Sequence, residues 1–368
     1  NLLDRSENNY LISLGRMEDT ISIACIDLST AEFHALSFPV NERLEYVKRE
    51  LVRLSPREII IQESILEEDE LLARLLTNMD GVVINRLPDW SFGLTGNRDI
   101  LLNQFKTVNL KGFGLEDDSP EIAVCGVLVT SIRETAGTML PHIASLHIVR
   151  EDSIVGLDES TQNNLELIRN TKDGSRKFTL LEVLDYTRTS MGSRLLKKWL
   201  LSPLMEKKRI ESRLNIVGFF YRNQIILSQF REIVGKIRDM ERLTAKLALD
   251  RANAKDLLGV KASLFQVLAV IDLLSSFEEV SGFLSTTISA APMVDSVAGL
   301  LEKSIPDDPS LQLSEGNLIR EGYNPELDRL RKVKNDAREV LSDLLAGEKE
   351  KTGISSLKLR YNRIIGYF

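Results

Sequence analysis

Three carboxylates near the ends of apolar segments are the first residues whose types could support chemistry. Asp27 and Glu32 flank a short polar stretch, and Glu63 follows the apolar run at 58–62. Carboxylates that converge in one cleft hold the metal ions of two-metal phosphodiester hydrolysis. Polar residues are equally typical of hairpin turns and strand ends, and three scattered candidates do not establish a shared cleft. A metal-dependent nuclease is therefore the minor interpretation.

Other catalytic and cofactor motifs are missing from the sequence. No phosphate-binding loop of the form G-x-x-x-x-G-K-[ST] occurs, and Gly112-Phe113-Gly114 lacks the third glycine of a dinucleotide fingerprint. Neither a nucleophile elbow nor a His-Glu-x-x-His helix is present. The sequence predicts no metal site, because no cysteine cluster accompanies the three histidines, His34, His142 and His147.

Two basic clusters are better candidates, because lysine and arginine bind nucleic-acid phosphates without reading sequence. On an expected helix at 190–201, Arg194, Lys197 and Lys198 lie opposite apolar residues, and a solvated helix face is the favoured interpretation there. Near the end of the chain, five basic residues accompany a single acid, Glu350. These candidates for contact with the DNA backbone are Lys349, Lys351, Lys358, Arg360 and Arg363.

The composition is that of an ordinary folded chain of two or three domains. Its 368 residues are 43% hydrophobic and 27% charged, with a net charge of −7. This charge excludes a protein that coats nucleic acid over its whole surface, but it leaves room for a local basic patch. No run approaches the roughly 18 uncharged apolar residues of a membrane span, so no membrane partner is expected. Cys25 and Cys125 lie in apolar stretches, which favours free thiols in a reducing compartment.

The elements that must position these residues fall into two kinds. Alternating and continuous apolar runs predict strands at 21–26, 33–38, 58–62 and 82–84. Helical spacing predicts intervening helices at 44–54 and 71–76. Together they indicate a small α/β domain that closes near residue 120.

Beyond residue 120 the helical pattern dominates. Helices are expected at 121–138, 190–201, 206–221, 223–236, 239–249, 252–274 and 324–347, with extended chain at 143–157. The last helix has the clearest start, because Asn324 is a good N-cap and Pro325 suits the first helical position. Its apolar residues form a seam wide enough for one partner helix, which is typical of an arm. After it, 357–362 alternates apolar and basic residues, as in a strand with one basic face.

Several segments resemble the MutS family of mismatch-recognition proteins, in the right order along the whole chain. The matching segments are Gly156-Leu157-Asp158, Asn164-Leu165-Glu166-Leu167, residues 179–185, Met191-Gly192-Ser193-Arg194-Leu195-Leu196, Asp239-Met240-Glu241-Arg242-Leu243, residues 322–328, Lys351-Thr352-Gly353, Leu357-Lys358, Asn362, and Gly366-Tyr367-Phe368.

The resemblance implies a multidomain chain. Residues 1–120 would be an α/β connector domain with a ribonuclease-H-like fold and no nuclease activity. Residues 121–323 would be the mainly α, long-helix core or lever domain, and 324–368 the outgoing lever helix and the start of the clamp. In the family, two levers and clamps from a dimer close around double-stranded DNA through backbone contacts, and the connector offers a surface to a MutL-like partner.

The resemblance also implies what this segment would not do. The family's mismatch-reading domain would precede Asn1, and its ATPase domain, which uses ATP and Mg²⁺, would follow the clamp. We therefore expect a middle segment that has no cofactor and is not itself an enzyme, and that couples the ATPase to clamping and mismatch recognition. The alternative is a naturally truncated homologue that acts in docking or recombination. The family implies a bacterial cytoplasmic location near the nucleoid.

Overall fold

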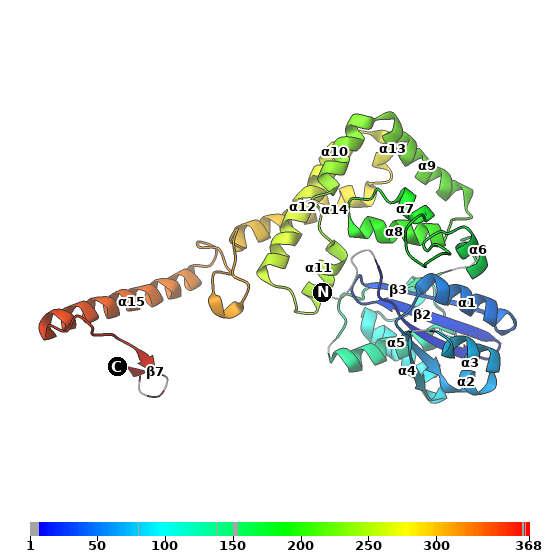
Figure 1. Ribbon diagram of the computed structural model, residues 1–368, viewed down its shortest axis with the longest axis horizontal. Helices are drawn as coiled ribbons and strands as arrows, with labels where there is room; N and C mark the ends of the chain where they lie inside the picture. The colour runs from blue at the N-terminus through cyan, green and yellow to red at the C-terminus, as the bar shows by residue number, and fades with distance from the viewer. Residues whose placement is uncertain (1–6, 80, 138, 150–153, 363, 365) are drawn as a thin grey trace. The chain divides into compact units, whose positions relative to one another are not determined.

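The computed structural model describes residues 7–79, 81–137, 139–149, 154–362, 364 and 366–368. The chain divides into two compact units at residues 298 and 299, and each unit is described by itself. The first unit holds an α/β domain followed by helices, and the second leads through one long helix to a hairpin (Figure 1). The coarse fold class expected from the sequence, α/β followed by mainly helical structure, is confirmed.

A six-stranded mixed sheet forms the centre of the α/β domain, in the order β5-β4-β1-β2-β3-β6. The first three strands pair antiparallel, β4 and β5 continue in parallel beside β1, and β6 pairs in parallel with β3. The strands are β1 (Leu11–Met17), β2 (Thr20–Asp27), β3 (Glu32–Pro39), β4 (Glu58–Gln62), β5 (Val83–Leu87) and β6 (His147–Ile148). The four predicted strands are confirmed, and β1, which the sequence did not reveal, occupies the centre.

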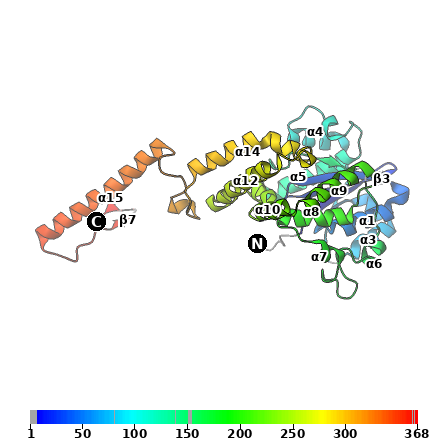
Figure 2. The ribbon, with the colours of Figure 1, turned by 90° about the horizontal axis from the view of Figure 1, so that it is seen from above.

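Helices cover both faces of the sheet (Figure 2). One face packs on α1 and α3, and the other packs on α4 and α5. Alternation along the strands explains the division, since neighbouring residues such as Ala24 and Cys25 point to opposite faces. The elements are α1 (Arg43–Leu54), α2 (Glu63–Glu68), α3 (Glu70–Thr77), α4 (Leu94–Phe105), α5 (Glu121–Ala136) and the 3₁₀ turns Val40–Glu42, Asp89–Phe92 and Lys111–Phe113.

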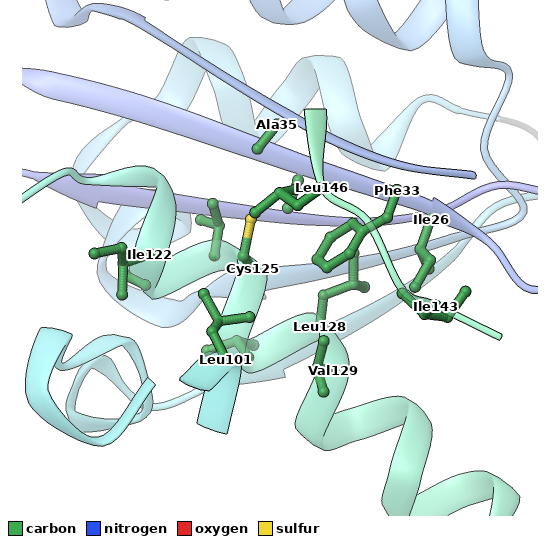
Figure 3. Packing of buried hydrophobic residues seen from close by; sticks show 14 of the residues in the cluster. Ile26, Phe33, Ala35, Leu101, Ile122, Cys125, Leu128, Val129, Ile143 and Leu146 are labelled. Carbon is green, nitrogen blue, oxygen red and sulfur yellow. The ribbon is translucent and has the colours of Figure 1, made fainter. Parts of the chain in front are cut away.

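Helix α5 differs from expectation in its partner. The sequence placed residues 121–138 at the start of the helical domain, whereas the structure packs α5 on β1, β2 and β3. Figure 3 shows Cys125 and Leu128 among Ile26 and Phe33 of the sheet. The opposite side of α5 lies against α4, where a Cβ on Gly126 would stand 2.4 Å from the Asn97 side chain. A helix covered on two sides is apolar nearly all round, so its pattern does not reveal which domain contains it.

The remaining helices of the first unit follow one another along the chain after β6. They are α6 (Glu159–Asn164), α7 (Leu180–Leu184), α8 (Ser190–Leu201), α9 (Lys207–Arg222), α10 (Gln224–Val234), α11 (Met240–Ala248), α12 (Ala254–Leu274), α13 (Glu278–Ser281) and α14 (Ser285–Ser304), the last of which runs into the second unit. Six predicted helices match α5 and α8 to α12, while α6, α7, α13 and α14 were not predicted. Helix α14 carries Pro292 in its interior, a residue that ordinarily indicates a break.

Helix α12 corrects the expectation that no segment could span a membrane. By length and composition alone it is long and apolar enough, with a mean hydropathy of 1.9 over 18 residues. Such a pattern is weak evidence, because core helices of folded domains share it. Here α12 contacts α10 and α11, and it buries Val260, Ser263 and Ile271. About a third of this apolar window (33%) is buried in the fold.

The second unit centres on α15 (Pro325–Thr352), which confirms the predicted last helix. The Asn324 side chain accepts a hydrogen bond from the Leu327 N–H at 3.0 Å, and Gly353 ends the helix with φ 68°. A 3₁₀ turn at Leu313–Glu315 precedes α15. After α15 the chain forms a hairpin of two strands, β7 (Tyr361–Asn362) and β8 (Gly366–Tyr367). The predicted strand at 357–362 is therefore confirmed only at its last two residues.

Candidate nucleic-acid interface and charged junction

The predicted DNA-backbone residues lie around the end of α15 and the start of the hairpin. Lys358 and Arg360 are exposed, and neither forms an ion pair within the described part of the chain. The backbone of Arg360 exchanges two hydrogen bonds with the backbone of Phe368, at 2.9 and 2.8 Å. These bonds hold the two ends of the hairpin together. Arg363 lies outside the described residues. Two cations on a short hairpin therefore remain available for an anionic partner.

The other two predicted residues, Lys349 and Lys351, belong to the last turn of α15. Lys351 pairs with Glu348 at 3.2 Å, and the Lys349 carbonyl accepts the Gly353 N–H that caps the helix. Basic residues in this place also stabilise the partial negative charge of a helix C-terminus. The ion pair of Lys351 and the favourable position of both lysines at the helix C-terminus therefore give these residues a stabilising role that does not require DNA.

The three carboxylates weighed as a metal site do not form one. Asp27 is fully buried and accepts hydrogen bonds from Asn8, the Asn9 N–H, and both the N–H and hydroxyl of Ser29. These bonds shape the turn between β2 and β3. Glu63 instead begins α2, and no group of three metal-binding side chains occurs in the described residues.

Arg194 is the centre of a buried ion-pair cluster instead of a solvated helix face. Its side chain is 5% exposed and donates to both carboxylate oxygens of Asp239 at 2.8 Å and to Glu241 at 2.6 Å. Burial raises the pKa of Asp239, but the hydrogen bonds and positive charge of Arg194, together with those of Arg242, outweigh burial and hold the pKa below its ordinary value. Asp239 also caps α11 by accepting the Arg242 N–H. The cluster therefore fixes α8 against the start of α11.

The same two helices reach the α/β domain through further charged contacts. Lys198 of α8 donates to Glu32 at the start of β3, and Lys197 lies 3.9 Å from the Glu7 carboxylate. From α11, the Arg242 guanidinium donates to the Glu7 carbonyl at 2.6 Å. We call this set, together with Arg194, Asp239 and Glu241, the charged junction. These contacts connect the segment before β1 and the start of β3 to α8 and α11, and Arg194 connects the two helices to each other.

His34 lies directly behind the charged junction. Its ring is buried, 3.6 Å from the Glu32 carboxylate, and its nitrogens have no hydrogen-bond partner among the described residues. Burial lowers the pKa of His34 from 6.5 to about 3, and the positive charge of Arg53 acts in the same direction. Glu32 also accepts the Tyr10 hydroxyl at 2.8 Å. At neutral pH the His34 imidazole that packs against the charged junction is therefore uncharged.

Comparison with known proteins identifies the family of the chain. The family model described as MutS domain II matches residues 9–144, and MutS domain III matches residues 160–359. The chain belongs to the MutS family. Its relatives include proteins named DNA mismatch repair protein MutS from Treponema denticola, 36% identical, and from Caldanaerobacter subterraneus, 34% identical, each matched over this whole chain. The chain spans 42% and 41% of those two relatives.

The MutS domain matches can be placed on the structure. Domain II ends at residue 144 and so includes α5, which agrees with the packing of that helix on the sheet. Domain III begins within α6 and includes the whole of α15. The charged junction therefore joins a MutS domain II to a MutS domain III within one unit.

Sequence reasoning missed the charged junction, although its residues were in view. Arg194 and Asp239 both fall in segments that resemble MutS, but 45 positions separate them. The sequence signal at Asp239 was its place directly before a predicted helix, which indicates an N-cap. An N-cap signal predicts where a helix begins, but it does not predict that the carboxylate also binds an arginine. Lys198 and Glu32 are 166 positions apart, and no local pattern connects them.

Proposed function

We propose that this chain is a coupling and clamping segment of a DNA mismatch repair protein. In this proposal the α/β domain is the connector, the helices are the lever, and the hairpin after α15 is the start of a clamp that contacts the DNA backbone. The matches to MutS domains II and III support the assignment. ATP and Mg²⁺ belong, in this view, to the full-length protein.

The sheet supports a connector of ribonuclease-H-like type. An antiparallel set of β1, β2 and β3 is followed by β4 and β5 in parallel with β1. The carboxylates that would hold metal in a nuclease of this kind make other bonds here, since Asp27 shapes a turn and Glu32 binds Lys198 and Tyr10. The domain is therefore better suited to a mechanical role than to hydrolysis.

The charged junction is the observation that carries the coupling proposal. Movement of α8 relative to the sheet would break the bond from Lys198 to Glu32, while movement of α11 would break the bond from Arg242 to Glu7. Arg194 ties the two helices together, so they would move as one body. A packed unit of this kind transmits a displacement instead of absorbing it.

The clamp assignment rests on exposed positive charge. Lys358 and Arg360 lie directly before the first hairpin strand, and Glu350 is the nearest acidic residue in the sequence. Lysine and arginine contacts to phosphate release counterions, so binding falls steeply with salt concentration. We propose that Lys349 and Lys351 add to this surface, and that Arg363 belongs to it as well.

Duplex binding measured by fluorescence anisotropy tests the clamp. We expect weak, salt-sensitive binding by the chain, and replacement of Lys358 and Arg360 by alanine should lower the log–log salt slope by about 2, since each phosphate contact contributes about 0.9. Lys207→Ala with Lys208→Ala on α9 is the matched control and should leave the slope unchanged. Nanomolar binding at about 150 mM salt, or an unchanged slope in the hairpin variant, would contradict the proposal.

The proposed partners follow from the family. We propose double-stranded DNA at the hairpin, a second MutS subunit that completes the clamp, and a MutL-like protein on the α/β domain. The proposed location is the bacterial cytoplasm, in association with the nucleoid.

A further inference from the structure

A cleft of about 700 Å³ lies beside the charged junction, within the first unit. Its walls come from the C-terminal half of α1, the end of α3 and the entry to β1 on one side, and from α6 and α8 on the other. Pockets of about 300–1,000 Å³ are typical of small-molecule sites. The size therefore fits a compact ligand and is too small for a nucleic-acid duplex.

The cleft has an excess of positive charge. Seven cationic residues line it against two carboxylates, Glu7 and Glu159. The cations are Lys48, Arg53, Arg57, Arg169, Arg194, Lys197 and Lys198. Five of them have a carboxylate partner, as in the pair Lys48–Glu159 at 2.9 Å. Arg57 and Arg169 are exposed and have no carboxylate partner in the part of the chain that the structure describes.

Both of these arginines stand on fixed backbone. The Arg57 N–H donates to the Tyr10 carbonyl at 2.9 Å, and the Arg57 carbonyl accepts from the Val83 N–H at 3.0 Å. Arg169 precedes Asn170, whose buried side chain donates to the Ser175 hydroxyl at 3.1 Å and closes the loop. Guanidinium groups on ordered backbone lose less freedom when they bind an anion.

A buried acceptor and an apolar wall complete the cleft. Gln162 is 4% exposed, and its amide nitrogen donates to the Leu157 carbonyl at 3.0 Å. Its amide oxygen is buried and has no hydrogen-bond partner among the described residues. Leu75, Met79 and Val82 line the same cleft.

We infer that this cleft binds a small ligand that carries a polyphosphate group. The phosphates bind Arg57 and Arg169, and the apolar wall covers the rest of the ligand. Arginine is suited to this chemistry because its planar fork donates two parallel hydrogen bonds to phosphate oxygens. The site uses no residue of the hairpin, so its existence does not depend on the clamp proposal.

Isothermal titration of the whole chain with inorganic tripolyphosphate tests the charged half of the site. Arg57→Ala with Arg169→Ala should weaken binding at least about tenfold, since a hydrogen bond to a charged group contributes enough for such a factor. Arg86→Ala with Arg251→Ala is the matched control, because both arginines are exposed and lie outside the cleft. Equal weakening in both double variants, or no measurable binding by the unaltered chain, overturns the inference.

Thermal unfolding gives an independent measurement. A ligand that binds the folded chain alone raises the melting temperature, and tripolyphosphate should do so in the unaltered chain and the control but not in the cleft variant. Sulfate at matched ionic strength separates specific binding from general screening. An equal rise with sulfate, or an equal rise in the cleft variant, contradicts a built polyphosphate site.

Discussion

The α/β domain and the helices that follow it are stabilised in different ways. Among the described residues, twenty and fifteen apolar side chains are buried on the two faces of the sheet, whereas the cluster around Phe219 in the helices buries three. The helices compensate with polar contacts, such as side-chain caps at Thr189, Asp239 and Asn253 and the ion pairs of Arg194. Apolar burial thus stabilises one region, and directed polar bonds position the other.

The largest effect should come from the sheet core. Phe33→Ala removes a side chain that is 1% exposed among Leu128 and Ile143, and we expect it to lower the free energy of unfolding by about 3–5 kcal/mol. Leu214→Ala on α9 is the matched control, because Leu214 is 60% exposed and should change stability by less than about 0.5 kcal/mol. Urea unfolding followed by circular dichroism measures both. Similar losses in the two variants would contradict the division between the regions.

The next effect should fall on the helices. Arg194→Ala leaves two carboxylates without their buried partner, and breaking such a pair costs about 3 kcal/mol. Hydrogen exchange should accelerate at the amides of α8 and α11 while the strands β1 and β2 keep their protection. Arg222→Ala, which removes an exposed ion pair with Glu279, is the control and should leave exchange unchanged. Loss of protection in the sheet to the same degree would mean that the two regions unfold together.

The pH dependence should reveal the imidazole behind the charged junction. His34 has its pKa lowered to about 3 in the folded chain, so in acid the unfolded chain binds a proton that the folded chain does not. Stability is therefore complete above pH 6.5 and falls as the pH drops, by about 2 kcal/mol between 6.5 and about 5.

His34→Gln should remove this slope, whatever its effect on stability at pH 7. His147→Gln, on the neighbouring strand β6 and exposed, is the control and should keep the slope. Urea unfolding at several pH values measures both variants. A slope that survives His34→Gln would assign the acid sensitivity to other groups.

Sequence patterns predicted the two regions to different extents, and the same physical difference explains why. Strands β2, β3 and β4 were predicted correctly because a buried strand has a continuous or alternating pattern of apolar residues. Strand β1 was missed, because Ser13, Gly15 and Arg16 interrupt its apolar run, even though Ser13 is fully buried. The domain of α5 and the partner of Arg194 depend on contacts between distant segments, which local patterns do not contain. The DNA-backbone residues stay a prediction.

The smallest effect tests whether local polar bonds position the helices. Asn253 caps α12 by accepting the Asp256 N–H at 2.9 Å, and the Asp256 side chain accepts the Asn253 N–H at 3.1 Å. Asn253→Ala removes the first bond and should cost about 1 kcal/mol in urea unfolding. Asn215→Ala is the same change at an exposed position inside α9, where alanine is the better helix former and should add a few tenths of a kcal/mol. Opposite signs for one substitution at two places would show that capping, not composition, holds α12 in place, and equal signs would refute it.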